Sequence, residues 1–142
     1  MDAEQLHGTW DLVRWRQIAP DGRETHPFTD RARGRLLYDR SGRVAVFLMH
    51  PGWVDGSVDG PVDTGLRAYS GRFTVVDGAV HHLVDMASQR ALINTTLVRR
   101  ATLDHGVLRL DAPAADDQTA RHVLEWRLVE TDNGTRIDRS AT

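Results

Sequence analysis

Short runs of aliphatic, β-branched and aromatic residues alternate with polar positions along the whole chain, and turn-forming residues separate the runs. A period of two places alternate side chains on opposite faces of an extended strand, so this pattern predicts β-strands. The predicted strands are 8–19, 34–39, 43–50, 68–76, 79–85, 95–103, 107–111 and 119–130.

The links between these runs are short and rich in residues that favour tight turns. Pro20-Asp21-Gly22, Ser41-Gly42, Asp77-Gly78 and His105-Gly106 each supply residues that tolerate positive φ or preset a turn. Neighbouring strands are therefore expected to pair as antiparallel hairpins. Eight such strands suffice to close an up-and-down barrel, so the sequence predicts an all-β, eight-stranded antiparallel barrel.

Three segments break the strand pattern. Residues 2–7 predict a short N-terminal helical turn with Asp2 as its N-cap. Residues 51–67 are rich in Gly and Asp, which predicts a mobile loop, and a loop of this length often serves as a lid. Residues 131–142 are polar and predict a flexible tail. The chain of 142 residues thus forms one domain, 1–142, with its core over about 5–130.

Composition excludes several classes of chemistry. All 18 basic residues are arginine and cysteine is absent, which excludes a lysine Schiff base, a thiolate nucleophile and a disulfide. The formal charge of -2 gives no electrostatic footprint for nucleic acid or an anionic membrane. Arginine without lysine is typical of a GC-rich bacterial genome. We find neither a signal peptide nor an apolar run of membrane-spanning length, so the expected location is cytoplasmic.

Gly8-Thr9-Trp10 opens the first predicted strand and resembles the G-x-W start of lipocalin-type barrels. The order and spacing of later segments strengthen this likeness: Tyr69-Ser70-Gly71-Arg72-Phe73, Val80-His81-His82, Arg99-Arg100 and the closing Trp126. Over residues 5–130 the chain resembles the bacterial lipocalin-like domain family of the calycin superfamily. Two segments depart from the family pattern: residues 51–67 form a Gly-Asp loop, and residues 89–95 replace a Pro-x-Trp-x-Gly stretch.

The resemblance implies a barrel that encloses one small apolar molecule. Some barrels of this type act as cyclases, isomerases or hydratases in biosynthetic pathways. In lipocalin-type barrels, an arginine of the last strand packs over the tryptophan of the first strand. Here that contact would join Arg127 to Trp10.

Two histidines are the first catalytic candidates. His81 and His82 are consecutive, so only one of them can face the inside of a barrel. The inward histidine would be a general acid or base, since imidazole titrates near neutral pH, and Asp85 could orient His81. The alternative is one solvated and one hydrogen-bonded core histidine, with Asp85 an ordinary surface acid.

Arg99 and Arg100 are likewise consecutive, and only one can point inward. A buried guanidinium needs a partner, so the inward arginine could clamp a carboxylate, enolate or phenolate oxygen. The alternative is an outward ion pair with Glu125 or Asp111. Tyr69 is a further candidate acid, or else an aromatic side chain of the barrel wall.

Other residues are candidates for the ligand-binding surface because they share the apolar side of a strand or lie at the expected barrel mouth. The arginines in the first strand also predict a bulge near Val13 that leaves Val13 and Trp15 inward. The candidate ligand-binding residues are Val46, Leu48, His50, Trp53, Phe73, His122, Leu124 and Trp126.

Metal and cofactor sites find little support. His50, His81 or His82 with Asp85 could supply zinc or iron ligands, but their spacing matches no metal motif. A single-histidine haem site is the other alternative, and a phosphate-binding glycine turn is absent. We therefore expect no metal and no cofactor.

These observations favour a cofactor-independent enzyme of secondary metabolism that acts as a cyclase, isomerase or dehydratase on a hydrophobic polyketide-like or aromatic substrate. The alternative is a non-catalytic carrier of a small hydrophobic ligand. A third hypothesis, a pure interaction module, predicts a filled core. The expected partner is a small hydrophobic molecule, and the expected state is a monomer or homodimer.

Overall fold

The computed structural model describes residues 1–131, and the tail predicted beyond Thr131 lies outside these residues. The chain is almost entirely β-structure joined by tight turns and short 3-10 helices. The strands are β1 (Gly8–Ile18), β2 (Glu24–Thr25), β3 (Arg33–Tyr38), β4 (Arg43–Met49), β5 (Leu66–Val76), β6 (Ala79–Ala87), β7 (Thr96–Asp104), β8 (Val107–Ala112) and β9 (Arg121–Thr131). The 3-10 helices are η1 (Ala3–Leu6), η2 (Pro51–Trp53), η3 (Val62–Thr64) and η4 (Arg90–Leu92).

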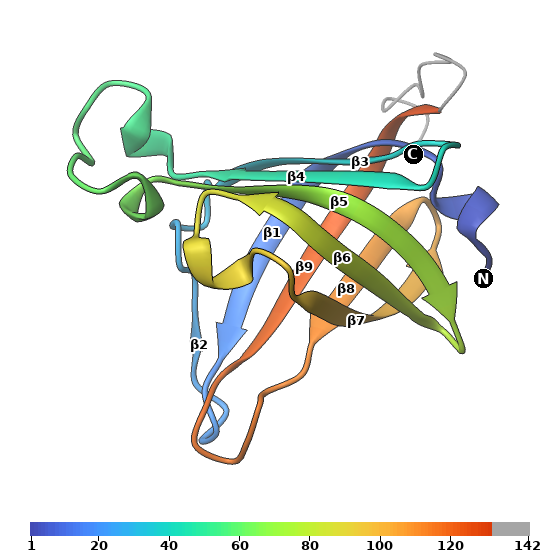
Figure 1. Cartoon of the computed structure of the whole chain (residues 1–142). Coiled ribbons are helices and arrows are strands. Elements are labelled where there is room, and N and C mark those ends of the chain that lie inside the picture. The colour runs from blue at the N-terminus through green and yellow to red at the C-terminus, as the bar shows by residue number, and fades with distance from the viewer. Residues whose placement is uncertain (132–142) are drawn as a thin grey trace.

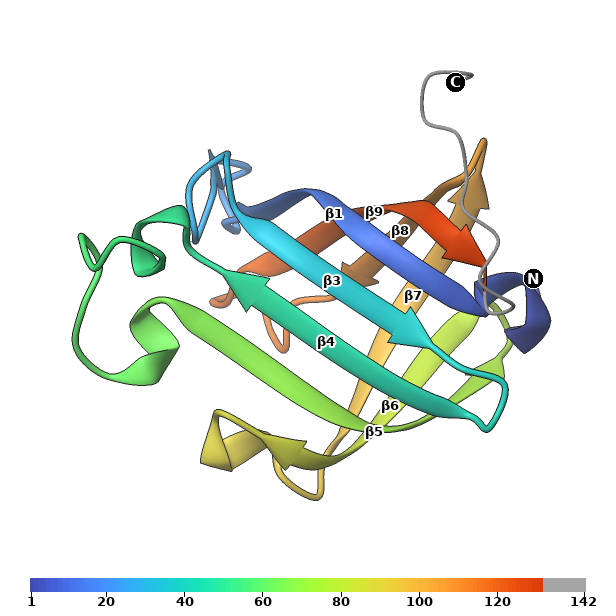
Figure 2. The same cartoon turned by 90° about the horizontal axis from the view of Figure 1, so that it is seen from above.

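The strands form one antiparallel sheet that closes on itself (Figures 1 and 2). Each strand from β3 to β8 pairs with the next in sequence, and β1 pairs with both β3 and β9. Only β2 stands outside this closure, as a short addition to the end of β1. The predicted all-β, up-and-down barrel is confirmed.

The predicted strands agree with the structure within a few residues at each end. The two-residue strand β2 was not predicted, because two residues carry no readable alternation. The predicted N-terminal turn is η1, where Asp2 accepts from the Gln5 N–H and the Gln5 side chain accepts from the Asp2 N–H. This reciprocal pair is a capping box. The loop 51–65 contains η2 and η3 and projects from one end of the barrel (Figure 1).

The predicted bulge in β1 is present, since the register with β9 shifts between Leu12 and Arg14. Its effect differs from the prediction at one residue. Trp15 faces inward and is buried, whereas Val13 is the additional residue and lies exposed on the outer face. The register between β5 and β6 also shifts, between Ser70 and Gly71. A Cβ at Gly71 would stand 1.9 Å from the Leu83 carbonyl oxygen, so β5 and β6 can approach here only with glycine.

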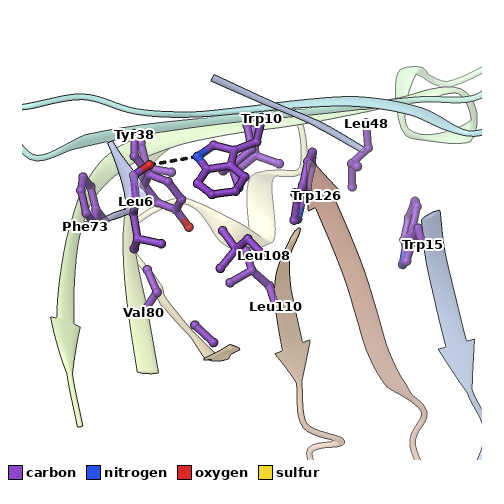
Figure 3. Packing of buried hydrophobic residues seen from close by; sticks show 14 of the residues in the cluster. Leu6, Trp10, Trp15, Tyr38, Leu48, Phe73, Val80, Leu108, Leu110 and Trp126 are labelled. Atoms are coloured by element: carbon purple, nitrogen blue, oxygen red, sulfur yellow. Dashed lines mark hydrogen bonds between the residues drawn. The ribbon is translucent and has the colours of Figure 1, made fainter. Parts of the chain in front are cut away.

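The two ends of the barrel differ in how they are filled. We call the end that carries η1 and the β3–β4, β5–β6 and β7–β8 turns the closed end, and the opposite end the open end (Figure 2). At the closed end, Leu6 of η1 enters the barrel and its carbonyl accepts a 2.9 Å hydrogen bond from the Trp10 indole (Figure 3). Side chains pack this end solidly. They include Tyr38, Phe73, Val80 and Leu108.

The implied packing of Arg127 over Trp10 is not found within residues 1–131. Arg127 follows the inward Trp126 and lines an outer groove with Asp11 and Arg35. The base of the barrel is closed by η1 and its contact with Trp10 instead.

Candidate functional site

A cavity of about 200 Å³ occupies the open half of the barrel. Its wall is mostly apolar, with a few polar side chains distributed among the aliphatic ones. In Figure 3, Trp15 and Leu48 stand apart from the closed-end cluster around Tyr38 and Phe73, and Trp126 lies between. The apolar lining consists of Leu36, Val46, Leu48, Ala68, Leu92, Leu97, Leu110, Ala112 and Leu124, with Trp15 and Trp126.

His82 of β6 lies at the floor of this cavity and is 0% exposed. Tyrosine hydroxyls hold both of its ring nitrogens. The Tyr38 hydroxyl lies 2.7 Å from Nε2, and the Tyr69 hydroxyl lies 2.6 Å from Nδ1. Tyr38 comes from β3 and Tyr69 from β5. The hydrogen-bonded series Tyr38–His82–Tyr69 therefore connects the packed core to the cavity wall.

Burial sets the protonation of this chain at neutral pH. Burial first, and the nearby Arg99 charge second, lower the pKa of His82 to about 3. Burial also raises the pKa of Tyr69 to about 12, although Arg99 opposes that shift. The pKa of Tyr38 is raised well above its usual value for the same main reason. At pH 7 the imidazole is therefore neutral and both tyrosines keep their protons.

Two arginines line the cavity without a carboxylate partner. Arg99 projects inward from β7, and Arg67 from the start of β5. Neither forms an ion pair within the described residues, and the Arg67 Nε is buried without a hydrogen-bond partner there. The Arg67 guanidinium lies 5.5 Å from the ring centroids of both Trp15 and Phe28. These cation–π contacts hold the Arg67 side chain in place.

The cavity wall on β1 and β9 adds further polar atoms. The Trp15 indole N–H donates to Nδ1 of His122 at 3.0 Å. The pKa of His122 is lowered by burial first and by the charges of Arg99 and Arg67 second. Trp126 is 1% exposed, and its Nε1 has no hydrogen-bond partner within residues 1–131.

Many residues predicted from the sequence do meet in this cavity. The inward member of each consecutive pair is now defined, since His82 and Arg99 line the cavity. They are joined there by Tyr69, Val46, Leu48, His122, Leu124 and Trp126.

The other candidates lie elsewhere. His81 follows the outer face of β6, Arg100 is exposed on β7, and the exposed Asp85 is 3.8 Å from Arg43. Phe73 lies in the closed end, with its ring centroid 4.6 Å from that of Tyr38. These residues therefore do not enter the site.

The two loop candidates have local roles. His50 caps η2 by accepting the Gly52 N–H on Nδ1 at 2.9 Å. The Trp53 ring covers Gly65 so closely that a Cβ there would lie 2.1 Å from Trp53 Cε3. Neither side chain lines the cavity.

Sequence reasoning missed two polar lining residues, Arg67 and Gln89, and six aliphatic ones, Leu36, Ala68, Leu92, Leu97, Leu110 and Ala112. Arg67 was assigned to the loop, but β5 begins at Leu66. A signal was present: Arg67 has the same parity as Tyr69, Gly71 and Phe73, so extending that strand by one pleat places it inward. Gln89 and Leu92 lie in the irregular β6–β7 link, where alternation gives no orientation.

Within residues 1–131 we find no group of three or more His, Cys, Asp or Glu side chains placed to hold a metal ion. The same residues contain no helix of the length and hydropathy needed to cross a membrane.

The closed barrel with a half-filled interior and a mixed apolar and polar cavity defines a lipocalin-type protein, a class suited to small-molecule binding. The family model described as a lipocalin-like domain matches residues 7–131, so the chain belongs to the lipocalin-like domain family. A search of curated proteins gives no match. Among solved structures, the chain is similar to a lipocalin-like protein from Bacteroides uniformis, with 13% identity, a TM-score of 0.49, and coverage of 87% of this chain and 97% of that one.

Proposed function

We propose that this protein binds a small, largely apolar molecule in the cavity at the open end of its barrel. One observation carries the proposal: the barrel is packed solid at one end and hollow at the other, and the hollow is lined by aliphatic and aromatic side chains. Such a cavity favours apolar ligands, and its few polar groups orient them.

Adjacent residues of β7 allow a matched test of binding. Leu97 lines the cavity, whereas Val98 lies on the outer face with 44% exposure. We expect Leu97→Trp to fill the cavity and abolish binding of naphthalene-type probes, measured by quenching of the native tryptophan fluorescence. Val98→Trp should leave their affinity unchanged. Equal affinity of both variants and the parent for these probes would place the ligand outside the cavity and contradict the proposal.

A second candidate is a cofactor-independent reaction of the cyclase, isomerase or dehydratase type. It is favoured by the convergence of Arg99, Tyr69 and His82 on one cavity. Arg99 and the Tyr69 hydroxyl would hold a substrate oxygen on which negative charge develops, and His82 would fix the position of that hydroxyl. The neutral His82, with its pKa of about 3, is suited to this positioning role at pH 7.

The binding and catalytic candidates differ in what they do to a bound molecule. A molecule that copurifies with the protein can be released, incubated with fresh protein and analysed by mass spectrometry and chromatography. A carrier returns it unchanged, whereas an isomerase, cyclase or dehydratase converts it to an isomer or to a product lighter by one water. Tyr69→Phe and His82→Gln should both slow such a conversion.

A further inference from the structure

We propose that the cavity selects a molecule that offers only hydrogen-bond acceptors and carries an anionic oxygen group such as a carboxylate. This inference rests on the proposed binding function and names the class of ligand. The argument comes from counting which polar atoms of the wall still have a proton to donate. Hydrogen positions follow here from the partners that each atom has.

The tautomer of His82 follows from the burial of Tyr38. Tyr38 is 1% exposed, and within residues 1–131 the hydrogen-bond partner of its hydroxyl is Nε2 of His82 alone. If Nε2 carried the imidazole proton, the hydroxyl proton of Tyr38 would be buried without an acceptor, which is unfavourable. Tyr38 therefore donates to Nε2, and the single proton of the neutral ring is on Nδ1.

That proton determines the role of Tyr69. Nδ1–H donates to the Tyr69 oxygen across 2.6 Å, so the hydroxyl proton of Tyr69 is not used by His82. Tyr69 lines the cavity and has no other hydrogen-bond partner among the described residues. Its O–H is thus free to donate to a bound molecule. The chain from Tyr38 through His82 to Tyr69 orients every proton toward the cavity, and each bond strengthens the next.

His122 follows the same logic on the opposite wall. An indole nitrogen can only donate, so the Trp15 contact requires that Nδ1 of His122 be the unprotonated acceptor. The neutral ring then carries its proton on Nε2. This N–H adds another donor to the set of cavity-lining groups.

The remaining polar atoms are donors by nature. Trp126 Nε1 and Arg67 Nε are buried without partners within residues 1–131. Arg99 lines the same cavity as Tyr69, His82 and His122, and its charge lowers the pKa of these three groups and of Tyr38. No carboxylate lines the described cavity, and Gln89 is the lining side chain with an unused carbonyl acceptor.

Unpartnered donors and two uncompensated cations require acceptors and negative charge. A carboxylate supplies both, while an alcohol, amide or amine brings protons for which the wall offers few acceptors, chiefly the Gln89 carbonyl. The aliphatic and indole surfaces then contact the apolar body of the molecule. Selectivity for the anion follows from this difference, since a neutral donor leaves wall donors unpaired.

The experiment has two parts. First, ¹⁵N chemical shifts of the imidazole nitrogens give the tautomers, with His82→Gln used to assign the His82 signals. We expect Nδ1–H for His82 and Nε2–H for His122. Second, titrations with naphthalene, 2-naphthamide and 2-naphthoate compare ligands of the same body. We expect 2-naphthoate to bind at least tenfold more tightly than 2-naphthamide.

A matched pair of arginine variants tests the source of the preference. Arg99→Met should remove most of the preference for 2-naphthoate, whereas Arg100→Met on the outer face should preserve it. An Nε2–H tautomer at His82, or equal binding of amide and carboxylate, would overturn the inference and leave the proposed function standing. If none of the three probes binds, the proposed function itself is contradicted.

Discussion

The closed and open halves of this barrel are built from the same strands but differ in whether their buried polar atoms have hydrogen-bond partners. In the closed half, the Trp10 indole donates a hydrogen bond to the Leu6 carbonyl, and the Tyr38 hydroxyl is hydrogen-bonded to His82. In the open half, Trp126 Nε1 and Arg67 Nε lack such partners within the described chain, and the Arg99 guanidinium donates to the Val98 carbonyl at 3.3 Å but pairs with no carboxylate there. One half thus resembles an ordinary core in which buried polar groups are paired. The other half contains buried donors without an acceptor among the described residues.

The comparison separates residues that stabilise the barrel from residues that line the cavity and would contact a ligand. Leucine, tryptophan and tyrosine occur in both halves, so residue type alone does not assign the role. What differs is whether the space beside the side chain is filled. The following substitutions test that difference, beginning with the largest expected effect.

A truncated leucine should be most costly in the closed half. Leu108 is 0% exposed within the packed cluster, whereas Leu124 lines the cavity. We expect Leu108→Ala to lower the free energy of unfolding by about 3–4 kcal/mol, because it creates a new void. Leu124→Ala only enlarges an existing one and should cost about 1–2 kcal/mol. Urea unfolding followed by circular dichroism measures both values, and equal losses would show that the halves are equally packed.

The pH dependence of stability should come largely from His82. Its pKa is about 3 in the folded protein and near 6.5 when unfolded, so below pH 6.5 the unfolded chain takes up a proton that the folded chain does not. Stability is therefore complete above pH 6.5 and is lost as the pH falls toward 3. Between pH 6.5 and 4.5 the loss should be roughly 2–3 kcal/mol.

The control for this prediction is His82→Gln, which removes the titrating group and keeps a hydrogen-bonding side chain. This variant should be less stable at pH 7 but have a flatter stability profile between pH 6.5 and 4.5. A profile as steep as that of the parent would assign the pH dependence to other groups.

The same features explain what could be predicted from the sequence. Strand alternation identified the barrel strands, and the parity rule correctly separated Val46 and Leu48 from their outward neighbours. It also required that one member each of His81/His82 and Arg99/Arg100 face inward. Choosing the member required the register of β6 and β7 with their neighbours, and the shift in that register between Ser70 and Gly71 was not predicted.

The composition of the cavity was less accessible. Whether an inward aromatic residue fills the barrel, as Phe73 does, or borders a cavity, as Trp126 does, depends on what the opposite strands contribute at that level. The pairing of Tyr38 with His82 joins residues 44 positions apart, and only closure of the barrel brings them together. Such contacts follow from topology and not from spacing along the chain.

The two tyrosines of the hydrogen-bonded chain should differ in their contribution to stability. Tyr38→Phe leaves Nε2 of His82 without a donor in a dry, packed region, and should cost about 2 kcal/mol. Tyr69→Phe removes the acceptor of Nδ1–H at the cavity wall, where water can take its place, and should cost about 1 kcal/mol. Thermal and urea unfolding measure both losses. A larger loss for Tyr69→Phe would contradict the assignment of these residues to dry and open regions.

The smallest loss of stability is expected from removing the N-cap of η1 at the closed end. Asp2 accepts the Gln5 N–H at 3.1 Å and so fixes η1, which carries the fully buried Leu6 into the base of the barrel. Asp2→Ala should lower stability by about 1 kcal/mol, the usual contribution of an N-cap. The loss should appear as a lower urea midpoint with an unchanged m-value. Because η1 lies at the end opposite the cavity, the affinity for naphthalene-type probes should stay the same, and a parallel loss of binding would show that the two halves do not act independently.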